Sequence, residues 1–208
     1  MKLVDMKVTE YLDVLKSDAP APGGGSVSAL AGAEGIGLFM MVADLTIGKE
    51  KYAAFEDTCK KAKEAGAGLY KALHDGIDKD TDAYNLVAAA FKMPKDTDEA
   101  KAARSKAIAD ATLTATQIPF DNMTYCYEGL KVAHTLVGAS NPNAASDLGV
   151  AALNLLAGVR GTWLNVKINL PGVKDEAKKA EFLEKGEKMM AEAAKLADEM
   201  YQSIEAAL

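Results

Sequence analysis

One segment of the sequence, residues 147–169, combines an acid with several amides in a helical pattern. At about 100° of rotation per residue, six polar or small residues fall within roughly ±40° of one line along a helix: Asp147, Asn154, Gly158, Gly161, Asn165 and Asn169. A solvated helix face usually carries Lys and Glu, and each Asn or Gly costs roughly 0.5–1 kcal/mol relative to Ala. The stripe predicts either a helix that lines a ligand groove or a tight helix crossing at which the asparagines bond to neighbours.

A glycine-rich loop precedes a second helical stripe of small and polar residues, Ser26, Ala33, Gly37 and Asp44, which align within about 20°. The run from Asp18 to Gly25 (DAPAPGGG) is a strong loop signal, and Ser26 after it can cap a helix. The run lacks the GxxxxGK[ST] spacing of a phosphate loop, and no strand precedes it. The free N–H groups of a helix N-terminus can still hold an anion or a carbonyl oxygen. Within that helix we expect Asp44 to be partly buried, either paired with a lysine such as Lys49 or functional.

Several common kinds of site do not appear in the sequence. His74 and His134 show no HExxH or other metal-ligand spacing, and Cys59 and Cys126 form neither a metal motif nor a disulfide framework. A formal net charge of −6 argues against nucleic acid or an anionic membrane as the main partner. Composition and pattern alone therefore indicate a helical domain with polar grooves, and they specify no reaction.

Two segments bear on localisation. Residues 1–12 lack the apolar core and cleavage site of a signal peptide, so we expect a cytoplasmic protein. Residues 27–48 are long enough to span a bilayer, but they contain Glu34 and Asp44. A central acid costs about 3 kcal/mol on insertion scales. We therefore interpret this stretch as a buried helix of a soluble bundle and expect no membrane partner.

The polar segments must be positioned by helices, because Ala, Leu, Lys and Glu are abundant and aromatic residues make up only 6% of the chain. Periodicity, caps and breakers predict helices over residues 8–17, 26–48, 49–78 with a continuation over 80–92, 97–139 with a kink or break at Pro119, 146–170 and 173–206. No segment shows a convincing two-residue alternation, and no linker divides the chain. We predict one all-α domain over residues 1–208, a multihelical bundle of about six helices.

Four blocks of the sequence resemble one protein family. They are residues 21–52 (APGGGSVSALAGAEGIGLFMMVADLTIGKEKY), 80–95 (DTDAYNLVAAAFKMPK), 115–121 (ATQIPFD) and 141–169 (NPNAASDLGVAALNLLAGVRGTWLNVKIN). They are similar to the cyclodeaminase/cyclohydrolase family, which includes stand-alone methenyltetrahydrofolate cyclohydrolases and the cyclodeaminase domain of formiminotransferase-cyclodeaminase. The blocks occur in the family's order, and the similarity covers nearly the whole chain.

The resemblance implies an all-helical homodimer with a folate groove near the subunit interface and no metal or redox cofactor. Cyclohydrolases of this family add water to 5,10-methenyltetrahydrofolate and give 10-formyltetrahydrofolate. Cyclodeaminases close 5-formiminotetrahydrofolate to the methenyl compound and release ammonia. The chain length favours hydrolysis, with the cyclodeaminase reaction, or both reactions, as the alternative. A non-catalytic helical interaction protein or a redox enzyme of the same pathway is disfavoured by the four ordered blocks and by the absence of a dinucleotide fingerprint.

The reaction implied by the resemblance needs a base for water, an acid or donor at the departing N5, and anchors for the pterin and the glutamate. Asp147 and Asp82 are the leading candidates for acid–base catalysis or pterin anchoring, because both lie in family-like blocks. A helix N-cap is the alternative for Asp147. Lys49 could donate a proton or bind the glutamate carboxylates, and its alternative is a solvated charge past a helix end.

The family-like blocks also contain eight candidates for substrate binding: Gly24, Gly25, Ser26, Asp44, Asn143, Arg160, Asn165 and Asn169. The glycines and the serine could place backbone donors near the ligand, and the asparagines could bond to the pterin or hold the water. Arg160 projects away from the stripe, so it could serve the partner subunit, the glutamate tail or a salt bridge. Asp44 stands where we expect an asparagine in the family, which could alter a hydrogen bond or add charge near the site.

Overall fold

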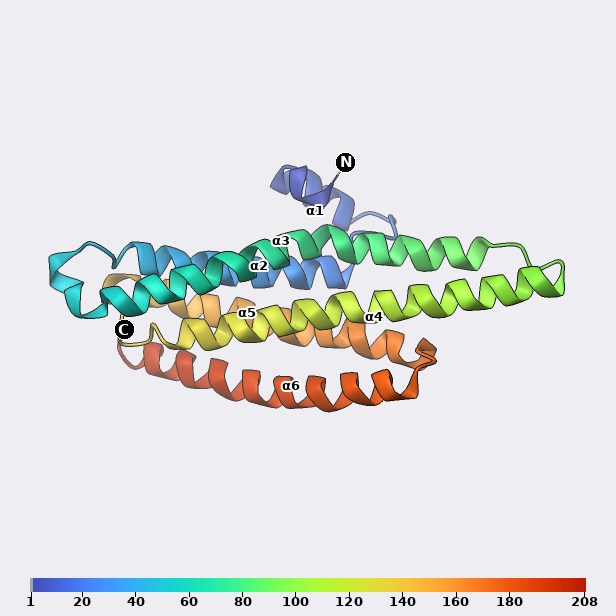
Figure 1. The fold of residues 1–208 in the computed structure, drawn as a ribbon. Helices are drawn as coiled ribbons and strands as arrows, with labels where there is room; N and C mark the ends of the chain where they lie inside the picture. Colours follow the sequence, from blue (N-terminus) through green and yellow to red (C-terminus); the bar gives the residue numbers. More distant parts are fainter. Residues whose placement is uncertain (1) are drawn as a thin grey trace.

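The computed structural model describes residues 2–208 and contains six α-helices joined by turns and short 3-10 helices. The α-helices are α1 (Val8–Leu15), α2 (Gly24–Asp44), α3 (Glu56–Lys92), α4 (Asp98–His134), α5 (Ala145–Asn169) and α6 (Glu176–Glu205), as Figure 1 shows. The 3-10 helices are η1 (Leu3–Asp5), η2 (Glu50–Phe55), η3 (Pro142–Ala144) and η4 (Leu170–Gly172). These described residues contain no strand, so the predicted all-α fold of about six helices is confirmed.

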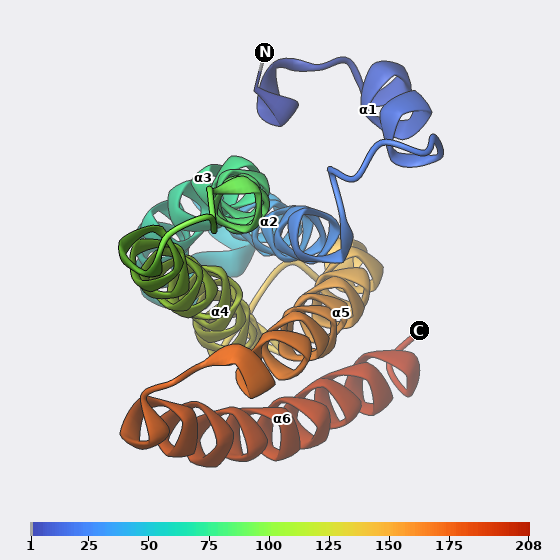
Figure 2. The same cartoon turned by 90° about the vertical axis from the view of Figure 1, so that its right-hand side faces the viewer.

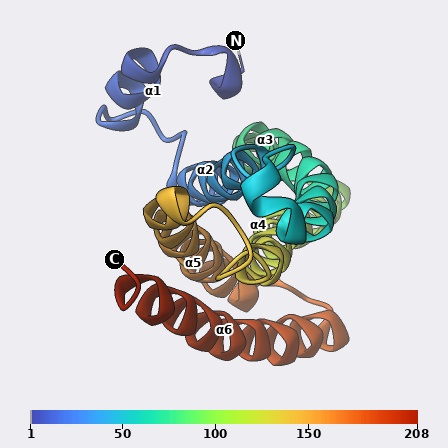
Figure 3. The ribbon, with the colours of Figure 1, turned by 90° about the vertical axis from the view of Figure 1, so that its left-hand side faces the viewer.

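Helices α2, α3, α4 and α5 form a four-helix bundle, and α6 packs against α4 and α5 (Figures 2 and 3). The short helix α1 lies outside the bundle, on the side of α2 and α3. Helices α3 and α4 form a long hairpin whose connecting turn extends past the end of α5 (Figure 1). One end of this hairpin is therefore left uncovered by the rest of the bundle.

Helix α2 is the most apolar helix because α3 and α5 pack against it and α4 also touches it. Ala29, Ile36, Phe39 and Val42 are fully buried along its length. The helix is long and apolar enough to cross a membrane, and 56% of its most apolar window is buried inside the bundle. Much of the apolar surface of α2 is therefore covered by the other helices of the bundle.

Small residues allow α2 and α5 to approach closely. A Cβ on Gly35 would lie 2.9 Å from the Ala151 carbonyl oxygen, and one on Gly158 would lie 3.2 Å from the Ser28 carbonyl oxygen. A Cβ on Gly161 would overlap the Ser28 hydroxyl. The two glycines of the predicted α5 stripe thus serve a tight helix crossing, which was one of the two interpretations of that stripe.

Several helix ends differ from the sequence-based prediction, and three of the differences involve tertiary contacts. Helix α2 begins at Gly24 rather than after Ser26, and the Ser26 hydroxyl turns to α3 instead of capping. Helix α3 is continuous to Lys92, and Gly66 and Gly76 within it give room to side chains from α2 and α4. Helix α4 also continues through Pro119 to His134. In each case tertiary packing or a tertiary hydrogen bond outweighs a local breaking signal.

The α5–α6 contact gives a stability prediction. Gly186 of α6 lies against Trp163 of α5, which is 6% exposed, and a Cβ on Gly186 would overlap the indole ring. We expect Gly186→Ala to lower the free energy of unfolding by about 2 kcal/mol through overpacking, or about 4–8 °C in Tm for a chain of this size. Thermal denaturation beside Gly68→Ala, whose Cβ would meet open space, checks this. A Tm for Gly186→Ala as high as that of Gly68→Ala would contradict the packing.

Candidate active site

A cavity of about 280 Å³ opens where the N-terminus of α2 meets α3, α4 and the C-terminal end of α5. It is lined by the glycine-rich loop and these helices: Pro20, Ala21, Gly23, Gly24, Gly25, Asp80, Thr81, Tyr84, Val87, Ala115, Asn165, Ile168 and Asn169. One carboxyl group, two amides and two hydroxyls share this lining with apolar side chains, as in small-molecule sites. Four predicted residues meet here, namely Gly24, Gly25, Asn165 and Asn169.

Asp80 is the acid of this cavity. The buried Ser26 hydroxyl lies within hydrogen-bonding distance of three oxygens of α3: the Ile77 carbonyl at 2.8 Å, Asp80 Oδ2 at 3.3 Å and Thr81 Oγ1 at 3.2 Å. Burial raises the pKa of Asp80, and hydrogen bonds from Ser26 offset only part of this rise. A carboxyl group whose pKa is moved toward neutrality is suited to accepting a proton and returning it.

The glycine-rich loop allows Asp80 to reach the N-terminus of α2. Gly25 lies in the first turn of this helix, and a Cβ on it would overlap the Asp80 carboxylate. Unpaired N–H groups and the helix dipole favour negative charge at this position. The anion that this helix end holds within the chain is therefore the carboxylate of Asp80.

A proline in α4 explains the position of Asn169. Pro119 has no N–H, so the carbonyl of Ala115, four residues earlier, lacks its helical donor. Asn169 Nδ2 donates to that carbonyl at 2.8 Å, and Asn165 Nδ2 donates to the Gly161 carbonyl at 2.8 Å. Within residues 2–208 the Oδ1 atoms of both asparagines accept no hydrogen bond, so each amide keeps an acceptor for a ligand.

Three other predicted residues lie outside this cavity, on the surface of the chain. Asp82 is exposed, because two residues from Asp80 correspond to about 200° of helix rotation. The prediction that Asp44 is partly buried is wrong, because its side chain lies on the surface. There its carboxylate forms a salt bridge with Lys63 at 2.6 Å. Arg160 is exposed on α5. The roles assigned to these residues stay predictions.

Lys49, Asn143 and Asp147 lie at the opposite end of the α2–α5 pair. There the Asn141 N–H donates to Thr46 Oγ1 at 2.9 Å and joins the turn after α2 to the turn before α5. Lys49 and Asn143 are exposed, and Asp147 is partly buried. Their roles in catalysis or binding also stay predictions.

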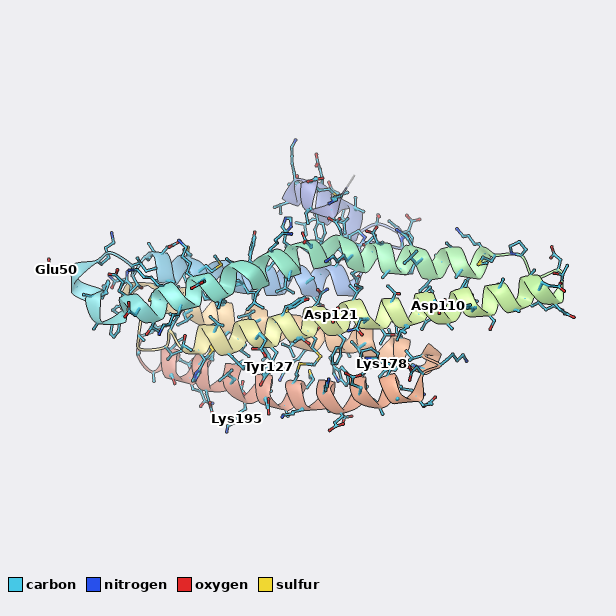
Figure 4. All side chains as sticks on the ribbon, viewed as in Figure 1. Glu50, Asp110, Asp121, Tyr127, Lys178 and Lys195 are labelled. Atoms are coloured by element: carbon cyan, nitrogen blue, oxygen red, sulfur yellow. The ribbon has the colours of Figure 1, made fainter. Side chains whose placement is uncertain are left out.

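The two groups of predicted residues are separated along the bundle. The 18 positions from Asp147 to Asn165 correspond to about 27 Å of helix axis. Figure 4 shows Glu50, which follows Lys49, and Asp110 of α4 toward opposite ends of the molecule. The N-cap of α5 is Ala144, with Asp147 in the first turn, so the N-cap interpretation of Asp147 is wrong.

Sequence reasoning missed Asp80, Thr81 and Tyr84. A signal for Asp80 was available, because it follows the buried residues Leu73 and Ile77 by seven and three positions. These intervals place it on the same buried face of α3. Asp80 therefore lies in register with the buried residues of α3, whereas Asp82, the catalytic candidate named from the sequence, does not.

Chemistry at a metal ion or at a thiol would need side chains other than those that line the cavity. No group of three or more His, Cys, Asp or Glu side chains within residues 2–208 is placed to hold a metal ion. Cys59 and Cys126 are buried, and burial raises the pKa of Cys126 to about 12. Among the groups that line the cavity, Asp80 is therefore the one best suited to proton transfer.

Comparisons with known proteins agree with this fold. The family model described as formiminotransferase-cyclodeaminase matches residues 7–203. The chain is 40% identical to methenyltetrahydrofolate cyclohydrolase of Methylorubrum extorquens, over 95% of each chain. It is 31% identical to formimidoyltransferase-cyclodeaminase of Sus scrofa, over 92% of this chain and 35% of that longer protein.

A solved structure gives the same result. The crystal structure of formiminotetrahydrofolate cyclodeaminase from Thermotoga maritima matches with a TM-score of 0.80 and 26% identity. The match covers 98% of this chain and 96% of that one. Fold and sequence together show that the chain belongs to the formiminotransferase-cyclodeaminase family, the cyclodeaminase/cyclohydrolase group that its four blocks resemble.

Proposed function

We propose that the protein hydrolyses 5,10-methenyltetrahydrofolate to 10-formyltetrahydrofolate at the Asp80 cavity. The observation that carries this proposal is a carboxyl group of raised pKa beside two amides, in a chain 40% identical to a cyclohydrolase over 95% of its length. The proposal requires no metal or redox cofactor, because the methenyl bridge of the substrate is already a cationic electrophile.

The proposed reaction has one addition step and one elimination step. Water attacks the bridge carbon while the Asp80 carboxylate takes one of its protons, which gives a tetrahedral carbon bonded to N5, N10 and a hydroxyl group. The bond between this carbon and N5 then breaks, and Asp80 returns its proton to N5. The hydroxyl loses its proton as the formyl carbonyl forms on N10. One water is consumed and one proton is released for each formyl group.

The rest of the cavity is suited to holding a reduced pterin. Asn165 and Asn169 each present a free Oδ1, which can accept from pterin N–H groups or from the attacking water. Tyr84, which is 44% exposed, offers a ring face, and Val87 adds an apolar wall. Polar groups thus fix orientation while apolar groups supply contact area.

Formiminotetrahydrofolate cyclodeaminase activity is the second candidate, favoured by the structural match to a protein with that name. In that reaction N10 attacks the formimino carbon and ammonia leaves after protonation. The tetrahedral carbon again lies between N5 and N10, so one carboxyl group can serve both reactions as the proton carrier.

Two assays of the purified protein test these proposals. With 5,10-methenyltetrahydrofolate, we expect faster loss of near-ultraviolet absorbance than in buffer alone. With 5-formiminotetrahydrofolate, release of ammonia measures the cyclodeaminase reaction. Ammonia release without accelerated hydrolysis would replace the first candidate by the second, and a protein inactive in both assays would contradict the proposed function.

We further propose that the protein acts as a homodimer through α5. Val150, Leu153, Leu164 and Ile168 recur at helical spacing on one side of α5 and are 47–79% exposed in the single chain. An apolar stripe of this length is typical of an interface. Antiparallel pairing of two copies of α5 about a two-fold axis would bring the start of one helix, with Asp147, toward the cavity end of its partner.

Changing one residue of this stripe tests the dimer. We expect Leu153→Lys to weaken dimerisation by about tenfold or more, because a buried interface would have to accommodate an unpaired charge. Sedimentation velocity at several concentrations measures the change. The control is Leu86→Lys on α3, where the leucine is 53% exposed. Equal effects of the two substitutions would exclude the α5 interface.

A further inference from the structure

We propose that Tyr11 of α1 is a further catalytic residue of the Asp80 site, and that it carries the second proton of the attacking water out of the cavity toward Glu34. This inference rests on the proposed function. That reaction releases one proton for each formyl group, at the step in which Asp80 gives the first proton to N5. A second group must therefore receive the proton that the hydroxyl loses as the formyl carbonyl forms.

Tyr11 is the one buried residue of α1. It is 7% exposed, whereas Val8 and Leu12 of the same short helix are 76% and 52% exposed. The Tyr11 hydroxyl is buried without a hydrogen-bond partner among residues 2–208. Such a hydroxyl costs stability, and a phenylalanine would fill the same space without that cost. Packing therefore explains the ring of Tyr11 but leaves its hydroxyl to be explained by something that binds it.

Tyr11 lines a second cavity, of about 360 Å³, which we call the α1 pocket. This pocket lies between the N-terminal segment and helices α2 and α3, and its lining includes Leu30, Glu34, Tyr70 and Ile77. Figure 2 shows α1 outside the four-helix bundle, on the side of these two helices. A space of this size has room for several water molecules, which can bond to the Tyr11 hydroxyl.

The α1 pocket and the active-site cavity follow one another along α3. Ile77 lines the α1 pocket, and Asp80 lines the cavity three residues later, on the same side of the helix. The Ser26 hydroxyl connects these two residues, because it lies 2.8 Å from the Ile77 carbonyl oxygen and 3.3 Å from Asp80 Oδ2. The pocket that contains Tyr11 therefore begins within one helical turn of the catalytic carboxyl group.

Two carboxyl groups act on the Tyr11 hydroxyl from different sides of the site. Burial raises the pKa of Tyr11, and the negative charges of Asp80 and Glu34 raise this pKa further. Tyr11 therefore stays protonated at neutral pH, close enough to both acids to feel their charge. Glu34 is exposed to solvent. His74, another titratable residue of the α1 pocket, has its Nδ1 3.8 Å from Asp75.

This arrangement gives a balanced path for the second proton. One O–H of the attacking water bonds to Asp80 and the other to the Tyr11 oxygen, which leaves a lone pair of the water directed at the bridge carbon. When the bond from carbon to N5 breaks, the remaining O–H bond breaks as well, and its proton passes to the Tyr11 oxygen. The phenolic proton moves through water in the α1 pocket to Glu34, which releases it to solvent. Tyr11 and Glu34 end in the protonation states in which they began.

The test removes the Tyr11 hydroxyl and keeps the ring. Tyr11→Phe is compared with Tyr70→Phe, which makes the same chemical change in the same pocket at a tyrosine that is 42% exposed. Glu34→Gln and the combined variant Tyr11→Phe/Glu34→Gln complete a double-mutant cycle. The measured quantities are kcat and KM for 5,10-methenyltetrahydrofolate and the Tm of each variant.

We expect Tyr11→Phe to lower kcat by about tenfold with little change in KM, as for a hydrogen bond made to the reacting atoms. The Tm of Tyr11→Phe should equal or exceed that of the wild type, because the variant lacks the unpaired hydroxyl. Glu34→Gln should lower kcat by about threefold, and the combined variant should be no slower than Tyr11→Phe, because both residues serve one path. Tyr70→Phe should behave as the wild type.

Three results would overturn the role of Tyr11. They are a normal kcat in Tyr11→Phe, a loss of kcat accompanied by a lower Tm, which would make Tyr11 a structural residue, and losses in Tyr11→Phe and Glu34→Gln that multiply in the combined variant. The wild type separates this inference from the proposed function. An active wild type with a fully active Tyr11→Phe contradicts only the inference, whereas a wild type that does not hydrolyse the substrate contradicts both.

Discussion

Replacing Asp80 by asparagine is expected to lower kcat for methenyltetrahydrofolate hydrolysis by about 100-fold or more, the range removed with a general acid or base. Asparagine keeps the size of the side chain and an acceptor for Ser26, but it cannot carry the proton from water to N5. Steady-state kinetics at neutral pH measure the loss. The exposed Glu64→Gln on the same helix is the control for an unrelated charge change.

The same variant should be at least as stable as the wild type at neutral pH. Burial raises the pKa of Asp80 in the folded state. Between its unfolded pKa, about 4, and the folded pKa, the folded state therefore binds the proton more strongly. Stability falls as pH rises through this window and stays lower above it. Asparagine carries no charge at any pH, so the Asp80→Asn variant does not lose this stability. The Tm of the variant should therefore exceed that of the wild type by more at pH 7 than below pH 4.

Two outcomes would count against Asp80 as the proton carrier. One is near-normal kcat in Asp80→Asn with a correctly folded protein. The other is a much larger loss in Asp82→Asn, which tests the assignment made from the sequence. A loss restricted to KM would instead indicate that Asp80 anchors the pterin.

Gly25→Ala is expected to have the second largest effect on activity. A Cβ at this position would overlap the Asp80 carboxylate, and the first turn of α2 leaves it no room to move. The carboxylate must leave the helix N-terminus, so kcat should fall by about 100-fold, close to the loss in Asp80→Asn. Overpacking should also lower the free energy of unfolding by about 1–3 kcal/mol.

The control for Gly25→Ala is Gly68→Ala in α3. A Cβ on Gly68 would meet open space, so alanine should stabilise the helix by about 0.5–1 kcal/mol without affecting kcat. Kinetics and thermal denaturation of both variants are compared at the same pH. Full activity in Gly25→Ala would show that catalysis by Asp80 does not require its carboxylate to lie against the N-terminus of α2.

The helices could be predicted from the sequence because their caps and periodicity are local. Thr97, where the sequence predicts this helix to begin, caps α4, and its hydroxyl accepts from the Ala100 N–H at 3.1 Å. The continuity of α4 could not be predicted, because the Ala115 carbonyl that Pro119 leaves without a donor accepts from Asn169, 54 positions away in sequence. Such tertiary compensation leaves no trace in a local pattern.

The candidate site could be predicted only in part, because a helical stripe fixes angles and not distances. Asp147 and Asn165 share a line along α5, yet about 27 Å of helix axis separates them. Asp82 and Asp80 lie in the same block, and only the register with buried Ile77 distinguishes them. The prediction that the glycine-rich loop precedes a helix N-terminus is confirmed. The acid that lies against this loop, Asp80, belongs to another helix, α3.

The most direct test of the central claim is a crystal structure of the protein with a non-hydrolysable analogue of 5,10-methenyltetrahydrofolate. We expect the one-carbon bridge within about 3–3.5 Å of the Asp80 carboxylate or of a water bound to it. The pterin should contact Asn165 or Asn169. An analogue bound elsewhere, with Asp80 still facing an empty cavity, would contradict the account.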